Sequence, residues 1–291
     1  MAASTAALRG ITKQYKDFTL GPVDMTVPAG SIVGLIGENG AGKTTLLKIL
    51  CGVNRADDGT VDLLGGSPAD AATRAKIGVV FEDAFFYGSF TAAQVARSLA
   101  GMYGARWNAD SFSAYLRRFG LDAGKKLKEY SRGMRLKLSL AAALAHDPEL
   151  LVLDEATAGL DPVVRGELLD LFLEFIQDER HSIVMSSHIT ADLEQIADSI
   201  AYLHNGQLLF QENKDDLLQE YGVLHCGEDV LPSLPAGLVV FTRRGAYGCE
   251  SLVRERRTVQ ELLPEASATR QGSMILCGFT AGGMHNERAF V

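Results

Sequence analysis

Gly37-Glu38-Asn39-Gly40-Ala41-Gly42-Lys43-Thr44 is the stretch of sequence that decides the fold. It matches the pattern GxxxxGK[ST] in full, follows an apolar run at residues 31–36 (SIVGLI), and leads into a helical pattern at residues 44–50. Glycines let the backbone curl so that its N–H groups point at phosphate oxygens, and the helix that follows adds the positive end of its dipole. The residues expected to bind nucleotide phosphates are Gly37, Glu38, Asn39, Gly40, Ala41, Gly42, Lys43, Thr44 and Thr45. A glycine-rich turn that arose by chance is the alternative.

A second segment ends in two carboxylates. The four apolar residues at 150–153 (LLVL) predict a buried strand, and Asp154 and Glu155 follow it. The carboxyl end of such a strand opens on the crevice in which ligands of parallel sheets bind. We therefore expect Asp154 to hold Mg²⁺ through its water shell, together with the hydroxyl of Thr44. Glu155 is placed to polarise the water that attacks the γ-phosphate. The alternative is that Asp154 caps a helix.

Two further motifs are ambiguous when taken alone. His188 ends the next predicted strand (residues 182–185), so it should reach the same crevice, donate to the γ-phosphate and hold the attacking water, unless it is an ordinary satisfied polar residue. Ser131-Arg132-Gly133-Met134 precedes an amphipathic run at residues 136–144. Ser131 suits a helix N-cap, and a glycine-bearing helix start is also a second anion site. Nothing in one chain places this second site near the first.

The order of these segments predicts an α/β fold. Apolar runs at residues 31–36, 77–81, 150–153 and 182–185 alternate with helical patterns, which indicates a mainly parallel sheet covered on both faces by helices. Residues 8–20 and 59–64 suit an antiparallel β subdomain, and residues 91–118 predict a helical insertion. We expect an ATPase-type domain at residues 1–221, with a helical subdomain at about 85–145. Residues 222–291 are expected to form a small α+β appendage, with strands at 238–242 and 273–277, a helix at 252–263 and a frayed tail after Gly278.

Composition narrows the classes of function. The 291 residues carry a net charge of −8, and this acidic balance argues against a nucleic-acid partner. The most basic cluster is expected to be a solvated face; it comprises Lys125, Lys126, Lys128, Arg132, Arg135 and Lys137. The N-terminus resembles no secretion signal, and no apolar stretch reaches the ~18 residues of a membrane span. The four cysteines, Cys51, Cys226, Cys249 and Cys277, lack CxxC spacing and are expected to be free, buried thiols in a reducing compartment.

Taken together, the motifs resemble the nucleotide-binding subunit of ATP-binding cassette (ABC) transporters, over about residues 8–221. Residues 37–44 resemble the Walker A loop of the family and residues 150–155 its Walker B strand with the catalytic Glu155. Tyr130-Ser131-Arg132-Gly133-Met134 resembles the signature, residues 158–161 with Asp161 resemble the D-loop, and His188 resembles the switch histidine. Tyr15 lies where an aromatic ring stacks on adenine.

The resemblance implies ATP and Mg²⁺ as ligands and a head-to-tail pair of subunits. ATP would lie between the loop of one subunit and the Ser131 helix of the other, whose helix start would bind the partner's γ-phosphate. Hydrolysis would open the pair and drive integral membrane permease subunits at the cytoplasmic face of the cell membrane. The second nucleotide-binding subunit would be either an identical copy or a different chain.

Two departures from the family pattern favour an exporter-type member. Arg132 and Met134 replace the usual Gly and Gln of the signature, and Glu82, a further candidate Mg²⁺ ligand through water, stands where Gln is usual. Permeases are expected to dock near residues 82–91, which hold the aromatic residues Phe85, Phe86, Tyr87 and Phe90. Packing of these rings in a core is the alternative.

Other classes of function remain open at this point. A soluble cassette ATPase for assembly or DNA maintenance would normally carry a coiled-coil insertion, a tandem cassette or a basic surface, and the sequence has none of these. A P-loop kinase or GTPase is disfavoured because no NKxD segment is present and a glutamate follows Asp154. Co-purification with a membrane protein would favour the transporter, and ATPase activity stimulated by DNA would favour the second class.

Overall fold

The computed structural model describes residues 4–81, 86–227, 229–235, 237–245, 248–263 and 268–269. Several predictions therefore lie outside the described residues. They are the Mg²⁺ role of Glu82, the part of Phe85 in permease docking or core packing, the free and buried thiol of Cys277, the strand at 273–277 and the frayed tail.

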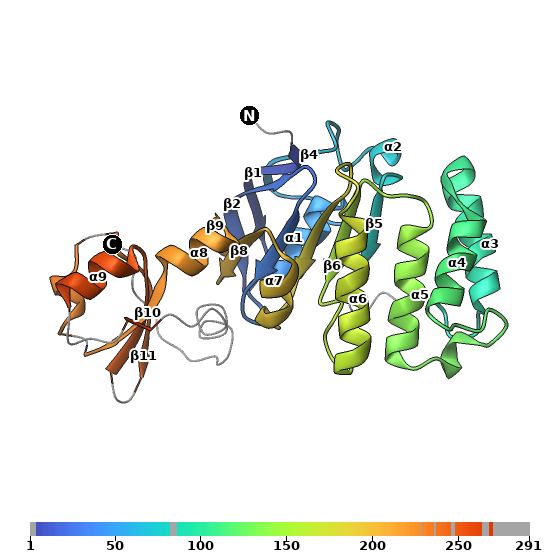
Figure 1. The fold of residues 1–291 in the computed structure, drawn as a ribbon. Coiled ribbons are helices and arrows are strands. Elements are labelled where there is room, and N and C mark those ends of the chain that lie inside the picture. Colours follow the sequence, from blue (N-terminus) through green and yellow to red (C-terminus); the bar gives the residue numbers. More distant parts are fainter. Residues whose placement is uncertain are drawn as a thin grey trace.

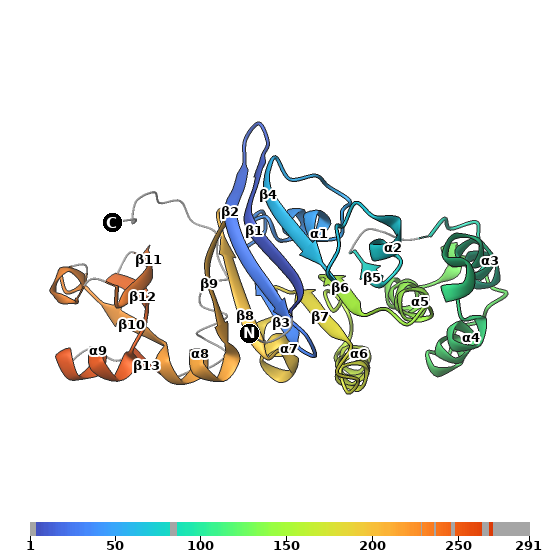
Figure 2. The same cartoon turned by 90° about the horizontal axis from the view of Figure 1, so that it is seen from above.

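A six-stranded sheet forms the centre of the molecule (Figure 1), and its strands follow the order β5-β6-β7-β3-β8-β9 (Figure 2). The strands are β5 (Ile77–Val80), β6 (Leu150–Asp154), β7 (Ser182–Ser186), β3 (Ile32–Ile36), β8 (Ser199–His204) and β9 (Gln207–Asn213). All neighbours are parallel except β8 and β9. Every residue of β3, β6 and β7 is buried, which explains why these strands read as unbroken apolar runs. The register places Asp154 opposite Ser186, so the carboxyl ends of β6 and β7 meet.

A three-stranded antiparallel sheet, β2-β1-β4, shares a hydrophobic core with the central sheet. Its strands are β1 (Ser4–Gln14), β2 (Thr19–Pro28) and β4 (Asp58–Leu63). The segment expected at 8–20 therefore holds most of β1, the turn of the hairpin at residues 15–18 and the first residues of β2. Helix α1 (Lys43–Leu50) lies on this side of the molecule (Figure 2). Leu46, Leu47 and Leu50 of α1 share one hydrophobic core with residues of both sheets.

Helices α5 (Arg132–Leu144), α6 (Pro162–Phe175) and α7 (Thr190–Ile196) lie on the opposite side from α1 (Figure 2). Leu140, Phe172 and Leu193 belong to the core that these helices form with the sheet. Helices α3 (Ala92–Tyr103) and α4 (Ala109–Arg118) pack beside α5 around a separate core. The helical pattern at 91–118 is broken between α3 and α4, because Gly104 has φ 55° and Asn108 caps α4 through Ser111 N. The short helix α2 (Ala71–Arg74) precedes β5.

Helix α8 (Lys214–Glu220) leads to a second small sheet, in the order β11-β12-β10-β13. It comprises β10 (Gly222–Cys226), β11 (Val239–Gly245), β12 (Gly248–Val253) and β13 (Ala268–Thr269), with α9 (Arg256–Leu262) packed beside it. The helix expected at 252–263 is wrong at its start, because Leu252 and Val253 are buried in β12. The predicted fold class is confirmed: a parallel sheet, an antiparallel subsheet, covering helices and a small α+β region.

The described residues test two expectations: that the cysteines are free, buried thiols, and that the sequence contains no membrane span. Cys51 and Cys249 are buried and Cys226 is half-buried, and all three are free thiols. Within the described part of the chain, every helix is too short or too polar to cross a bilayer.

Candidate active site

The loop at residues 37–44 curls because two of its glycines adopt a left-handed backbone. Gly40 has φ 84° and Gly42 has φ 106°, a region that other residues rarely enter. A Cβ atom on Gly42 would lie 2.8 Å from Cζ of Phe18 and 3.0 Å from Cδ1 of Leu20, so the loop also packs too closely against the start of β2 for a side chain there. Among the described residues, no backbone acceptor binds the N–H groups of Gly40, Gly42, Lys43 and Thr44. The loop therefore presents several unpaired donors at the start of α1, which is the chemistry that a triphosphate requires.

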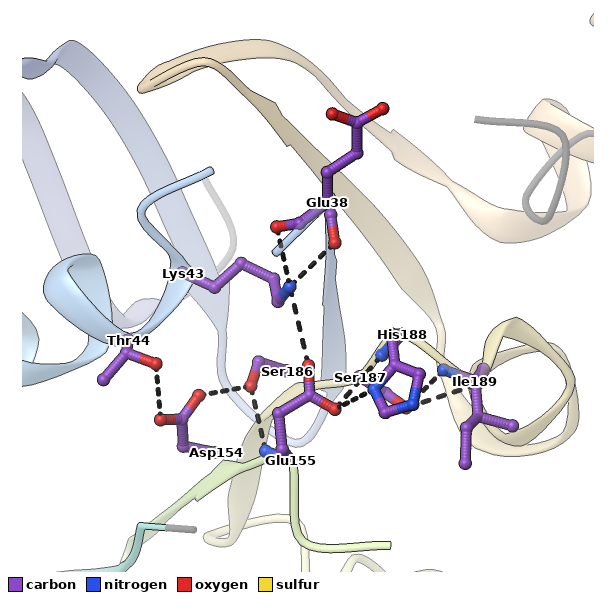
Figure 3. A network of polar contacts seen from close by, with 10 residues as sticks. Glu38, Lys43, Thr44, Asp154, Glu155, Ser186, Ser187, His188 and Ile189 are labelled. Atoms are coloured by element: carbon purple, nitrogen blue, oxygen red, sulfur yellow. Dashed lines mark hydrogen bonds and ion pairs between the residues drawn. The ribbon is translucent and has the colours of Figure 1, made fainter. Parts of the chain in front are cut away.

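The ammonium group of Lys43 is held over this loop. Its Nζ donates to the carbonyl oxygens of Gly37 at 2.7 Å and Glu38 at 3.2 Å, and it lies 3.5 Å from Oε1 of Glu155 (Figure 3). The side chains of Lys43 and Glu155 are only 7% and 10% exposed. Their charges thus face each other across a nearly closed space, where electrostatic interactions are stronger than in water.

Thr44 and Asp154 are hydrogen-bonded to each other across the site. Thr44 Oγ1 donates to Asp154 Oδ2 at 2.7 Å, and Ser186 Oγ donates to Asp154 Oδ1 at 2.6 Å (Figure 3). Within the described residues, no cluster of three His, Cys, Asp or Glu side chains forms a protein metal cage. One carboxylate and one hydroxyl nevertheless suit Mg²⁺, which keeps most of its waters and takes further oxygens from substrate phosphates. Asp154 caps no helix, so that alternative is wrong.

Glu155 and His188 are joined by a short side-chain hydrogen bond. Nδ1 of His188 lies 2.6 Å from Oε2 of Glu155, and the backbone N–H of His188 also donates to this oxygen at 3.3 Å. Glu155 has φ 52°, a left-handed conformation that a glutamate adopts only when its surroundings enforce it. The enforcing contacts are two hydrogen bonds from Glu155 N, to Ser186 O and to Ser186 Oγ, both at 3.1 Å. The strand ends thus bring together the two residues that the sequence placed in one crevice.

The signature segment stands at the start of α5. Ser131 caps α5 by accepting from Met134 N at 3.2 Å, so its cap role is present in the structure. A Cβ on Gly159 would lie 3.2 Å from Nη1 of Arg132, and one on Gly133 would lie 3.5 Å from Leu160. The signature and the loop at 158–161 therefore pack on each other. Asp161 ends this loop and caps α6 through Val164 N at 3.0 Å.

Tyr15 lies on the hairpin between β1 and β2, near the loop through its neighbour Phe18. Its ring is 42% exposed, its centroid lies 6.4 Å from that of Phe18, and Asn54 donates to its hydroxyl at 3.3 Å. A half-exposed ring at this place is available for stacking.

Sequence reasoning missed two contributors to the site. Ser186 holds both Asp154 and Glu155, and Phe18 supports Gly42. The position of Ser186 at the end of an apolar strand was the only signal for it. Cys51, one residue beyond α1, contributes no reactive thiolate, since burial and the nearby charge of Asp154 raise the pKa of its thiol to about 12.

The chain is similar to several known proteins. The family model for the ABC transporter matches residues 20–158. The bacitracin transport ATP-binding protein BcrA of Enterococcus faecalis is 36% identical over 212 residues, which cover 71% of this chain and 68% of that protein. The lantibiotic transport ATP-binding protein SrtF of Streptococcus pyogenes is 33% identical over 211 residues, covering 72% and 90%. An uncharacterized ABC transporter ATP-binding protein of Synechocystis is 38% identical over 206 residues, but the match spans only 58% of its length.

Solved structures agree with these relatives. One described as an ATP binding subunit of an ABC transporter superposes with a TM-score of 0.68 at 28% identity and covers 74% of this chain and 92% of that one. The cbiO1 protein of Clostridium perfringens, part of the ABC transporter complex cbiONQ, gives 0.62 at 25% identity, covering 75% and 91%. These names favour a transporter subunit over a soluble ATPase for assembly or DNA maintenance. The chain belongs to the family of ABC transporter ATP-binding proteins, the ATPase subunits of membrane transporters.

Proposed function

We propose that this chain binds ATP with Mg²⁺, hydrolyses it to ADP and phosphate, and thereby powers membrane permease subunits in export. The observation that carries the proposal is the convergence of Lys43, Glu155 and His188 at the mouth of the glycine loop. Each is a residue type that phosphoryl transfer to water requires, and three separate elements of the chain bring them together.

Phosphate binding is an exchange of partners in this site. The unpaired N–H groups of the glycine loop receive the phosphate oxygens, and Lys43 turns from the carbonyls of Gly37 and Glu38 to the outer phosphates. Tyr15 stacks on the base. Thr44 and Asp154 hold Mg²⁺, which neutralises charge on the phosphates when it is bound.

The proposed base is Glu155. Its carboxylate accepts the proton of the attacking water, and the hydrogen bond at Oε2 fixes the ring of His188. His188 is 49% exposed at its side chain, so its ring remains open to a ligand above the carboxylate. In this role it donates to the γ-phosphate and keeps the water in line for attack.

The active unit in this proposal is a pair of nucleotide-binding subunits. Helix α1, which opens the phosphate site, and helix α5, which begins at the signature, lie on opposite sides of the central sheet (Figure 2). Ser131 and Gly133 would therefore complete the site of a second subunit rather than their own. Arg132 adds positive charge at this position in place of the usual glycine.

Membrane permeases are the proposed partners. Tyr87 is 78% exposed and is therefore available for docking. The nearby Phe86 and Phe90 instead pack on the core of α3 to α5. We take export as the direction because BcrA and SrtF are named for bacitracin and lantibiotic transport. Such a subunit works at the cytoplasmic face of the membrane.

The test is Mg²⁺-dependent release of phosphate by the purified chain, alone and together with the permeases encoded beside it. We expect phosphate release that is lost in Lys43→Ala, and co-purification with a multi-span membrane protein. Absence of phosphate release in both preparations would reject the proposal. Activity that depends on DNA would instead favour the maintenance class.

A further inference from the structure

We infer that Arg165 and Asp192 form a positioning pair that fixes the loop of His188 relative to the loop at residues 158–161 of the same chain. The inference rests on the proposed function, because it concerns how the proposed catalytic groups are held in place. Neither side chain belongs to a motif that the sequence singled out.

The pair joins the starts of two helices. Arg165 lies in the first turn of α6, where its backbone N–H donates to the carbonyl oxygen of Asp161 at 3.0 Å. Asp192 lies in α7, four residues after His188, and its N–H donates to Ile189 O at 3.2 Å. The side chains meet between the helices, with Arg165 Nε 3.4 Å from Asp192 Oδ1. One end of the link is thus one turn from Asp161 and the other is one turn from His188.

Burial makes this pair different from the other ion pairs of α6. The side chain of Asp192 is 3% exposed, and its second oxygen, Oδ2, is buried without a hydrogen-bond partner in the described structure. A buried carboxylate with a single cationic partner depends strongly on that partner, since separation leaves its charge uncompensated. By contrast, Glu174 at the other end of α6 is 63% exposed in its pair with Arg118, and such pairs contribute little.

Each end of the link is anchored to a functional segment. At α7, Ser187 Oγ accepts from Ile189 N at 2.9 Å, which closes a tight turn around His188, and His188 contacts Glu155. At α6, the preceding loop places Gly159 directly beneath the guanidinium of Arg132. A displacement of the signature segment would therefore move the start of α6. Through the pair of Arg165, which is 31% exposed, and the buried Asp192, it would also move the loop of His188.

The same link has a consequence for the proposed pair of subunits. The signature would bind the partner's nucleotide, whereas His188 would act on the chain's own nucleotide. Binding of the partner's nucleotide at the signature would thus change the position of His188 at the chain's own nucleotide. Arg165 and Asp192 would transmit this change within one chain. Breaking the link between Arg165 and Asp192 should slow the chemical step and leave nucleotide binding unchanged.

The experiment compares Asp192→Asn, Arg165→Gln and the double variant with the wild-type chain, and uses Glu174→Gln as the matched control. Each single variant should lower kcat about tenfold, because a small misplacement of a catalytic group has effects of this order or larger. The Kd for ATP should change by less than about twofold, and the double variant should be no slower than the slower single variant. The control should keep the wild-type kcat.

Hydrogen exchange of the nucleotide-free chain supplies a readout that does not depend on turnover. The segment at residues 187–196 should exchange faster in both single variants and at the wild-type rate in Glu174→Gln. Asp192→Asn keeps the shape of the side chain, so it carries the test if Arg165→Gln fails to fold.

Three results would overturn the inference: unchanged kcat, additive losses in the double variant, or unchanged exchange at residues 187–196. A wild-type chain that releases no phosphate would reject the proposed function itself. An active wild-type chain with variants that behave like it rejects only the positioning pair.

Discussion

Replacing Glu155 by Gln removes the proposed base while leaving the shape of the site unchanged. In the structure one carboxylate oxygen of Glu155 faces Lys43 at 3.5 Å and the other faces His188 at 2.6 Å. The amide of Gln has the same size, but it takes up no proton from water at neutral pH. All donors of the glycine loop remain in place, so the variant separates chemistry from binding.

The size of the effect follows from the role of the residue. Loss of a general base slows a reaction about 10²- to 10⁴-fold. This range corresponds to about 3 to 5 kcal/mol in the activation free energy. The affinity for ATP should stay the same or rise, because Glu155 competes with the phosphates for Lys43 in the nucleotide-free site. Slow turnover with intact binding should also trap ATP between two subunits.

The assay measures phosphate release at saturating ATP and Mg²⁺, ATP affinity by calorimetry, and the oligomeric state by size-exclusion chromatography with ATP. Glu149→Gln is the matched control, because Glu149 directly precedes β6 at the opposite end from Glu155 and forms a half-exposed pair with Lys76. The control should hydrolyse ATP at the wild-type rate. Wild-type turnover in Glu155→Gln would refute the assignment of Glu155 as the base.

Three further outcomes are expected. Lys43→Ala should abolish tight ATP binding in a calorimetric titration, and an unchanged affinity would reject the phosphate role of the loop. Glu82→Gln should shift the Mg²⁺ concentration needed for half-maximal ATPase activity, whereas identical titrations would place Glu82 outside the site. Burial lowers the pKa of His146, so the folded chain takes up this proton at a lower pH than the unfolded chain does, and the free energy of unfolding should fall as pH drops below about 6.5. The unfolded chain then binds a proton that the folded chain does not. His146→Gln should flatten this decline in denaturant titrations, and an equally steep decline would exclude His146 as its source.

The sequence was most informative where burial and chemistry act on the same few residues. The strand before Gly37 and the strand before Asp154 are buried on both faces, so they appear as short apolar runs with functional residues at their ends. At Leu252 the sequence was misleading. The residues that follow it fit a helix with a charged outer face, whereas Leu252 itself pairs with β10 in a strand. Pairing between distant strands leaves no local pattern.

Within the candidate site, the sequence predicted which residue types would converge but not how they are held. The support of Glu155 by Ser186 depends on the register of β6 and β7, which a single sequence does not encode locally. Likewise, the pairing of Arg165 with Asp192 depends on how α6 packs on α7. The catalytic role of Glu155 and the partner role of Ser131 stay predictions until they are measured.

Tyr221 stands at the proposed boundary between the ATPase domain and the C-terminal region, and its surroundings argue against a loose tether. It is 2% exposed, its ring centroid lies 5.7 Å from that of Phe210 in β9, and Arg254 of the C-terminal region donates to its hydroxyl at 2.8 Å. Val223 and Leu252 continue the same hydrophobic core across the boundary. A chain cut after Tyr221 would thus expose an apolar edge to water, and the two regions should melt as one cooperative unit.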